Sequence, residues 1–495
     1  MGSDARKKVA TSYGFSIGGT LVVLGMHFLS MKVLAEYMPV DDFGVFALLM
    51  VVSQGFVIFC GCGMALTVVK RIAGAGAGAT DRFVVTNALV IRLALLSLFS
   101  ITVFGAGRSL MPEVLASKLD SFVYYLPLMF TLALLRETFF NVLQGRQQFH
   151  WFALIKIIAA GARLSAILWL TQSSRLGVQE LIWVEVLTST SAVVFLIFLT
   201  GALRLVRVSV LRVDEMRSLL RESLPLYAND IFSYIYSGAT LLLLGILLAS
   251  VDVGLFSAAS RVPQAFVGVF LAMVNVYFPT VSSLISAGKL LEARRWMHLA
   301  LPSSSCCVCL VALFSMLFRD EIVRILFAEQ YIPAATAMSF LMLNCVFTCV
   351  GQLMGLTAVA AGHASVPLRV NCAASACNVV ACFVFIPIWG IPGAVAAQLV
   401  GSVLAVLIYG FKLTQFKFPP NMLETGLPLC VGILLASVYE ASALDHVSIR
   451  IGFLGAYVVL CWFLLPELRK LARIVFDLVA DFGKERLSVC RKSEV

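Results

Sequence analysis

The stretch Ser250–Pro279 reads SVDVGLFSAASRVPQAFVGVFLAMVNVYFP, and it is long and apolar enough to cross a lipid bilayer. It also carries a charge, Arg261, well inside the apolar run. An arginine near the centre of a bilayer costs about 2.5–3.5 kcal/mol by insertion scales, so such residues usually face the protein interior or water. The stretch therefore predicts a membrane-spanning helix that presents a cation to the inside of a helix bundle.

This stretch has a counterpart earlier in the chain. Identical residues recur at one constant offset of 210 residues, in the pairs Asp42 and Asp252, Gly44 and Gly254, Phe46 and Phe256, Gln54 and Gln264, Phe56 and Phe266, and Val57 and Val267. Val51 stands at the position that corresponds to Arg261, so the charge departs from the repeat. Repeats of this kind occur in transporters whose halves flank a central cleft.

The composition indicates a polytopic membrane protein. The chain has 495 residues, of which 60% are hydrophobic and 13% charged, whereas soluble proteins carry about 25% charged residues. Runs of roughly 20 apolar residues predict about fourteen spans, near 10–35, 43–69, 83–106, 121–144, 152–171, 178–203, 222–249, 254–286, 297–318, 333–361, 366–387, 391–411, 422–440 and 448–466. We interpret the first run as a span and not as a signal peptide, because no clear cleavage site follows it.

The repeat maps the second run onto the eighth, which predicts two six-helix lobes of the same orientation followed by an extra helix pair. The predicted parts are an N-tail (1–9), an N-lobe (10–203), a basic interlobe linker (204–221), a C-lobe (222–411), the helix pair (412–466) and a basic C-tail (467–495). With a cytoplasmic N-terminus, 25 of the 37 Lys and Arg residues fall on the cytoplasmic side and six on the other. This bias predicts that both termini, the linker and both tails are cytoplasmic.

No signature of catalysis is present. The sequence has no GxxxxGK phosphate loop, no HExxH, no GxSxG and no paired-Cys metal motif. Most of the 13 Cys residues lie inside apolar runs, where Cys behaves as a small apolar residue. We therefore expect neither an enzyme nor a metal site, and no nucleic-acid partner.

The chemistry must then lie in the charges inside the spans. The cations there are Lys32, Arg92, Arg136, Lys156, Arg163 and Arg261, and the acids are Glu137, Glu185 and Asp230. The two lysines lie near helix ends, where such side chains can also reach the headgroups. Because cations outnumber acids, ion pairing cannot neutralise all of them, and the excess predicts a cavity with a positive wall. Guanidinium groups bind phosphate oxygens bidentately, so the pattern favours an anionic, phosphate-bearing cargo.

The acids have two interpretations. A carboxylate inside the membrane can bind H⁺ or Na⁺ and so couple transport to an ion gradient, which makes Asp230, Glu185 and Glu137 candidates for ion coupling. The alternative is an ion pair with one of the arginines. The residues alone leave both open, and beyond a coupling ion we expect no cofactor.

Four segments resemble a known family. They are Asp41–Leu49 (DDFGVFALL), Val253–Arg261 (VGLFSAASR), Ile325–Ala335 (ILFAEQYIPAA) and Ile386–Ala397 (IPIWGIPGAVAA), and the last follows the Asn371–Asn378 helix. In order and spacing they resemble the polysaccharide transporters of the multidrug/oligosaccharidyl-lipid/polysaccharide exporter superfamily, the O-antigen and exopolysaccharide flippases. The resemblance covers nearly the whole chain.

The resemblance implies a flippase in the inner membrane of a bacterium. Its cargo would be an undecaprenyl-diphosphate-linked oligosaccharide repeat unit, moved to the outer leaflet by alternating access for surface polysaccharide such as lipopolysaccharide or exopolysaccharide. A polysaccharide polymerase and glycosyltransferases would be its neighbours. Arg261 falls where related lipid II flippases place an arginine, but His27 and Lys32 replace the arginines of their first helix, which argues against lipid II as cargo.

Two alternatives remain. A cation-coupled multidrug exporter of the same superfamily would favour a cavity biased toward acids, whereas this sequence is biased toward Arg and Lys. A membrane polysaccharide polymerase or glycosyltransferase generally needs a large polar loop or soluble domain, and the longest hydrophilic segment between the predicted spans is about twenty residues.

Overall fold

The computed structural model describes residues 3–75, 79–110, 118–146, 148–172, 176–202, 211–442, 446–467 and 469, and all secondary structure within these ranges is helical. The helices of the first half are α1 (Ser3–Tyr37), α2 (Val40–Gly61), α3 (Met64–Ala75), α4 (Ala79–Leu110), η1 (Asp120–Tyr125), α6 (Leu126–Gly145), α7 (Phe149–Gln172) and α8 (Val178–Thr200). Those of the second half are α10 (Val213–Leu247), α11 (Ser250–Ser286), α12 (Leu290–Leu317), α13 (Arg319–Leu326), η3 (Glu329–Ala334), α14 (Ala335–Ala360), α15 (Ser365–Trp389), α16 (Ile391–Gln415), α17 (Met422–Ser442) and α18 (Val447–Leu464). The predicted all-α fold is confirmed.

Helices long and apolar enough to span a membrane occur thirteen times in the described part of the chain. They correspond in order to the second through fourteenth of the predicted runs. The first predicted run falls within α1, although many of its side chains lie outside the described residues. Residues 204–210 of the predicted basic linker and nearly all of the C-tail also lie outside them, while the rest of that linker, from Val213 on, is the start of α10.

The second predicted span is shorter than the sequence suggested. The apolar run 43–69 reads as one helix, but α2 ends at Gly61 and α3 begins at Met64. Between them Cys62 and Gly63 adopt left-handed backbone angles, with φ of 48° and 63°. A left-handed residue after the last turn ends a helix, so α3 is a separate element and not the end of a span.

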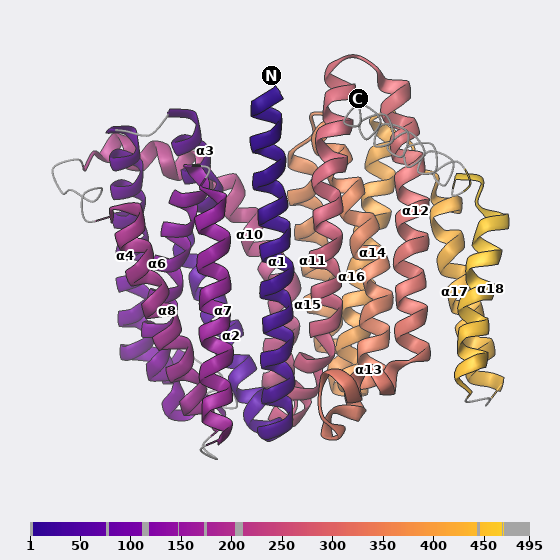
Figure 1. Ribbon diagram of the computed structural model, residues 1–495, viewed down its shortest axis with the longest axis horizontal. Coiled ribbons are helices and arrows are strands. Elements are labelled where there is room, and N and C mark those ends of the chain that lie inside the picture. The colour runs from indigo at the N-terminus through magenta and orange to yellow at the C-terminus, as the bar shows by residue number, and fades with distance from the viewer. Residues whose placement is uncertain are drawn as a thin grey trace, which may run out of the picture. The chain divides into compact units, whose positions relative to one another are not determined.

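The described chain divides into two compact units. The first comprises Met1–Arg261, Val323–Ala334 and Asn371–Gln398. Inside it α1 packs along α7, and α6 packs against both α8 and α2 (Figure 1). Tightly buried apolar side chains such as Phe130, Phe139 and Leu143 fill the space around α6. This packing fixes the helices that carry most of the predicted intramembrane charges.

The second unit comprises Val262–Ile322, Ala335–Val370 and Leu399–Val495. Its core forms around α12, which packs against α14 and α17, with α18 beside α17 (Figure 1). Arg319 and Glu440 form an ion pair of 2.8 Å, and Arg450 pairs with Glu321. The hydroxyl of Tyr457 donates to the carbonyl of Cys306 over 3.1 Å. The last two helices are therefore anchored to α12 and α13 by polar contacts as well as by apolar packing.

Candidate substrate-binding site

A buried ion pair joins α7 to α8. The guanidinium of Arg163 donates through Nε to the carboxylate of Glu185, and both side chains are largely buried. Charges withdrawn from water in this way are favourable only when they are paired. Each residue was predicted from its position within a span, and the structure shows that they neutralise one another.

Further cations gather around this pair. Arg261 of α11 and His27 of α1 both interact electrostatically with Arg163 and Glu185. His27 also interacts electrostatically with Arg261 and Arg136. We call Arg136, Arg163, Glu185, Arg261 and His27 the arginine cluster. Helices α1, α6, α7, α8 and α11 thus contribute to one charged group, which contains three guanidinium groups and a single carboxylate. The cluster carries an excess positive charge even when His27 is neutral.

Arg261 is the cluster member with unused hydrogen-bonding capacity. Its Nε is buried and has no hydrogen-bond partner, and no carboxylate lies within ion-pair distance of it among the residues that the structure describes. A buried polar group without a partner costs about 1–3 kcal/mol, and more when it is charged. An unpaired guanidinium beside a neutralised one is therefore suited to receive an anion.

Arg136 belongs to the cluster, and Lys156 borders it. Arg136 donates from Nη1 to the hydroxyl of Ser189 over 3.2 Å. The ammonium of Lys156 lies 4.1 Å from the ring centroid of Phe152 and 5.7 Å from that of Phe140, and it interacts electrostatically with Arg136. Ser189 was not predicted as a site residue, although it lies four residues after Glu185 and so shares its helix face.

Arg92 is placed apart from the cluster. Its side chain is only 1% exposed, and it donates to the Thr138 hydroxyl over 2.7 Å and to Glu137 over 3.4 Å. It was predicted to line the cavity wall, but burial and pairing withdraw it from any open surface in this structure. Glu137 is likewise engaged by Arg92, so its predicted role in ion coupling competes with an internal ion pair.

Lys32 and Asp230 also lie outside the cluster. Lys32 is exposed on α1. Asp230 is half-buried on α10 and interacts electrostatically with Glu137, and no cation forms an ion pair with it within the described ranges. The neighbouring Asn229 accepts a hydrogen bond of 3.1 Å from Asn371 of α15. Asp230 is therefore held beside a polar helix contact and keeps its carboxylate available.

The contact between α10 and α15 is a row of polar groups, here called the ladder, that was not predicted from the sequence. Besides Asn371, the ladder includes Ser375, which donates to the carbonyl of Phe232 over 2.6 Å, and Asn378, which donates to that of Tyr236 over 3.1 Å. The three α15 residues are spaced by four and three, so they lie on one helical face. That spacing was the signal available in the sequence.

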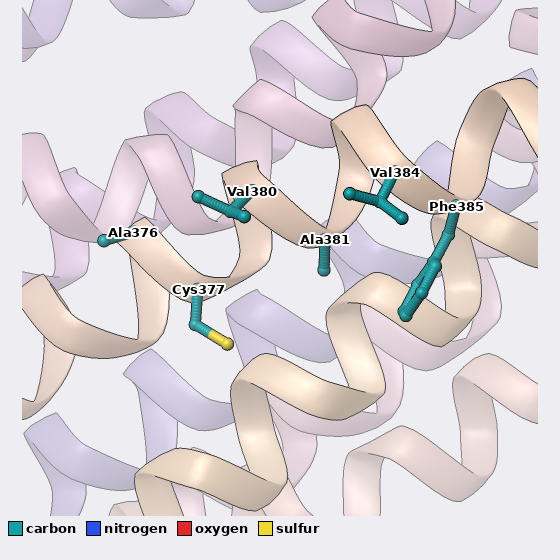
Figure 2. Close-up of a pocket in the computed structure, with 6 residues that line it drawn as sticks. All are labelled: Ala376, Cys377, Val380, Ala381, Val384 and Phe385. Atoms are coloured by element: carbon teal, nitrogen blue, oxygen red, sulfur yellow. The ribbon is translucent and has the colours of Figure 1, made fainter.

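Another part of α15 borders a pocket with no charged residue. Its lining consists of Ala376, Cys377, Val380, Ala381, Val384 and Phe385, whose side chains are shown in Figure 2. Such a surface can accommodate a hydrocarbon chain but offers nothing to a phosphate. No group of His, Cys, Asp and Glu residues that would hold a metal ion occurs in the described ranges.

Comparisons with known proteins identify the family and the fold. The family described as "Polysaccharide biosynthesis protein" matches residues 9–285, which include every residue of the arginine cluster. No curated protein sequence matches the chain.

Solved structures resemble the chain over most of its length. The lipid II flippase MurJ in an inward closed conformation has a TM-score of 0.72 at 13% identity, covering 94% of this chain and 99% of its own. An inward-facing multidrug resistance MATE family transporter has a TM-score of 0.66 at 16% identity, covering 81% and 99%. A transporter of the MOP superfamily from Pyrococcus furiosus, described as having a binding pocket of reverse polarity, has a TM-score of 0.58 at 15% identity, covering 82% and 95%.

At these identities the structural matches show the fold, which is that of MurJ and the MATE transporters. The family match extends over more than half of the sequence. This multi-pass membrane protein belongs to the polysaccharide biosynthesis protein family.

Proposed function

We propose that the protein is a flippase that moves an undecaprenyl-diphosphate-linked oligosaccharide repeat unit from the cytoplasmic to the outer leaflet of a bacterial inner membrane by alternating access. The product would serve the synthesis of a surface or exported polysaccharide, such as O-antigen or exopolysaccharide. A polysaccharide polymerase and glycosyltransferases would act next to it in the pathway.

The observation that carries this proposal is the arginine cluster. Arg261 lies beside the Arg163–Glu185 ion pair with its Nε unpartnered. A diphosphate bridging Arg261 and Arg163 would supply the negative charge that the cluster lacks, and guanidiniums bind phosphate oxygens in a fork geometry. The family match to polysaccharide biosynthesis supports a glycan as the remainder of the cargo.

Glu185 has a specific role in this proposal. In the absence of cargo it neutralises Arg163, and an arriving diphosphate would compete with it for the guanidinium. Exchange between an internal and an external anion keeps the guanidinium of Arg163 paired both with and without cargo. It also favours release, since Glu185 can return to Arg163.

Asp230 supports a gradient-driven cycle. It is half-buried in a predicted span and has no cation partner in the described part of the chain, which fits a carboxylate that binds H⁺ or Na⁺. Converting Asp230 to Asn should abolish the dependence of transport on the ion gradient and leave cargo binding intact. Vesicles with and without an imposed gradient would measure this, and gradient-dependent transport by the variant would return Asp230 to a structural role.

The second candidate is a cation-coupled multidrug exporter, which the fold shared with MATE transporters favours. The excess of cations in the cluster argues against a cationic drug as cargo.

The deciding experiment is a lipid analysis of a strain that lacks the protein. We expect a complete undecaprenyl-diphosphate-linked repeat unit to accumulate on the cytoplasmic leaflet, together with loss of surface polysaccharide. Re-expression of the intact chain should restore both. Unchanged glycan lipids combined with increased sensitivity to cationic drugs would instead establish the exporter.

A further inference from the structure

The end of α10 is capped by a residue from the first half of the chain. Lys118, which precedes η1, donates from Nζ to the carbonyl of Gly245 over 2.7 Å and also to the carbonyl of Leu248. Gly245 lies in the last turn of α10, which ends at Leu247, and Leu248 is the C-cap residue. Carbonyls at a helix C-terminus lack a partner within the helix. Lys118 therefore ties the start of the η1 segment to the end of α10.

The end of α1 is capped in the same way by a residue from the second half. The side-chain amide of Gln330, in η3, donates to the carbonyl of Ala35 over 2.7 Å and to that of Met38 over 3.2 Å. Pro39 has no N–H group, so the Ala35 carbonyl has no donor four residues ahead in the chain. Gln330 supplies the missing donor.

The two caps are related by the internal repeat. Ala35 and Gly245 are separated by 210 residues, as are Met38 and Leu248, which is the offset of the sequence repeat. The donors also come from matching places, because η1 and η3 are both six-residue 3₁₀ helices that directly precede a long helix, α6 and α14. Each half thus uses a residue at its 3₁₀ segment to cap the equivalent helix end, of α10 or of α1, in the other half.

A glycine pair lies between the caps. A Cβ atom added to Gly44 of α2 would collide with the backbone carbonyl of Ser250, and one added to Gly254 of α11 would collide with that of Val40. Gly44 and Gly254, like Val40 and Ser250, are again 210 residues apart. The α2–α11 crossing is therefore symmetric, and its backbones approach more closely than any side chain would allow.

We propose that Lys118 and Gln330 are a symmetric pair of latches that hold this end of the helix bundle closed, and that the transport cycle must release both. Hydrogen bonds from a side chain to exposed carbonyls are strong enough to bias a conformational equilibrium and weak enough to break within a cycle. The glycine crossing supplies the surface on which the halves meet. All the contacts lie within the first compact unit.

The latches differ in chemistry. Burial lowers the pKa of the Lys118 ammonium, while Asp41 and Asp252 nearby favour its charged form. Gln330 carries no charge. The amide of Gln330 nevertheless donates to carbonyls at positions equivalent to those that Lys118 contacts. A glutamine should therefore partly replace Lys118, and a lysine should partly replace Gln330.

Hydrogen–deuterium exchange on the purified full-length protein tests the proposal without any cargo. Met removes the donors of either residue while keeping a chain of similar length. If the latches hold one closed state, Lys118→Met should speed exchange by about tenfold not only at 244–252 but also at 34–42, the end that Gln330 caps, since loss of a hydrogen bond changes an opening equilibrium by about that factor. Gln330→Met should affect the same two segments.

The controls separate a latch from a local cap. Lys118→Gln and Gln330→Lys should restore slow exchange at both segments, and Lys289→Met, at an exposed residue paired with Glu292, should leave them unchanged. Exchange within 339–350 of α14 reports whether each variant remains folded. A change confined to the variant's own helix end, or no change, would overturn the proposal. Because the readout does not involve a glycan, it is independent of whether the proposed flippase activity is correct.

Discussion

Arg261 combines an unpaired Nε with a position beside the Arg163–Glu185 ion pair. Replacing it with Ala should weaken binding of farnesyl diphosphate, a soluble probe of the diphosphate group, by about 10–100-fold, since hydrogen bonds to charged groups contribute about 1.5–3 kcal/mol. Arg261→Lys should lie in between, because Lys keeps the charge but loses the fork. Calorimetry on the purified protein measures both variants, and Arg319→Ala, which removes a partly exposed ion pair elsewhere, should bind normally. Equal affinity of Arg261→Ala and the unaltered chain would remove Arg261 from the site.

Removing the charge of Glu185 should change the affinity for farnesyl diphosphate in the opposite direction. Glu185→Gln removes the internal competitor for Arg163, so farnesyl diphosphate should bind severalfold more tightly, while transport should slow because the bound anion is no longer displaced. The loss of a single negative charge from a cluster with three guanidiniums is the physical reason. Binding measured by calorimetry and surface polysaccharide measured in cells should therefore change in opposite directions. Weaker binding would mean that Glu185 only orients Arg163.

The charges of this site were predictable one by one, but their partners were not. A charge inside an apolar run is visible in the sequence, which is how Arg163, Glu185 and Arg261 were found. Helical rotation then separates neighbours: Arg136 points to the cluster whereas Glu137, the next residue, pairs with Arg92. Which cation remains unpaired depends on contacts between helices distant in sequence, and no local pattern reports it.

At the scale of helices, close backbone contact makes the α2–α11 crossing sensitive to one methyl group. In Gly254→Ala the new Cβ would meet the Val40 carbonyl, a backbone atom that cannot rotate away, and overpacking of this kind costs about 1–3 kcal/mol. We expect a lower melting temperature and faster hydrogen exchange at 38–46. Gly452→Ala is the matched control, since a Cβ there meets nothing within 4 Å. If the two variants melted alike, the crossing would not be tightly packed.

The helices themselves were largely predictable, because an apolar run of about twenty residues has few alternatives in a membrane. The break between α2 and α3 was not predicted, because the hydropathy of a sequence does not depend on its backbone angles. Cys62 and Gly63 lie in an apolar context, and their left-handed conformations end the helix where composition alone continues it. The Gly-Cys-Gly sequence at 61–63 was the available signal.

At the scale of the whole molecule, the repeat links sequence to conformation. Six matching residue pairs predicted a duplication, and the contacts that recur at the same offset of 210 support it. The repeat could not reveal which ends of the halves touch, since a transporter with such symmetry has more than one state. The described contacts identify the touching end as the one where α1 and α10 terminate, opposite to the N mark in Figure 1.

The charge bias predicts which side of the membrane that end faces. Both termini are predicted to be cytoplasmic, so the latched end would face outward and the cargo would enter from the cytoplasm, as the proposed direction of flipping requires. A fluorescent protein that matures only in the cytoplasm should fluoresce when fused after Val495, and alkaline phosphatase, active only outside, should be inactive there. The same reporters inserted between Ser442 and Val447 would be expected to give the reverse pattern, because α17 and α18 are each long and apolar enough to cross a membrane once. An active phosphatase at the C-terminus would place the latches on the cytoplasmic side and contradict the proposed direction of transport.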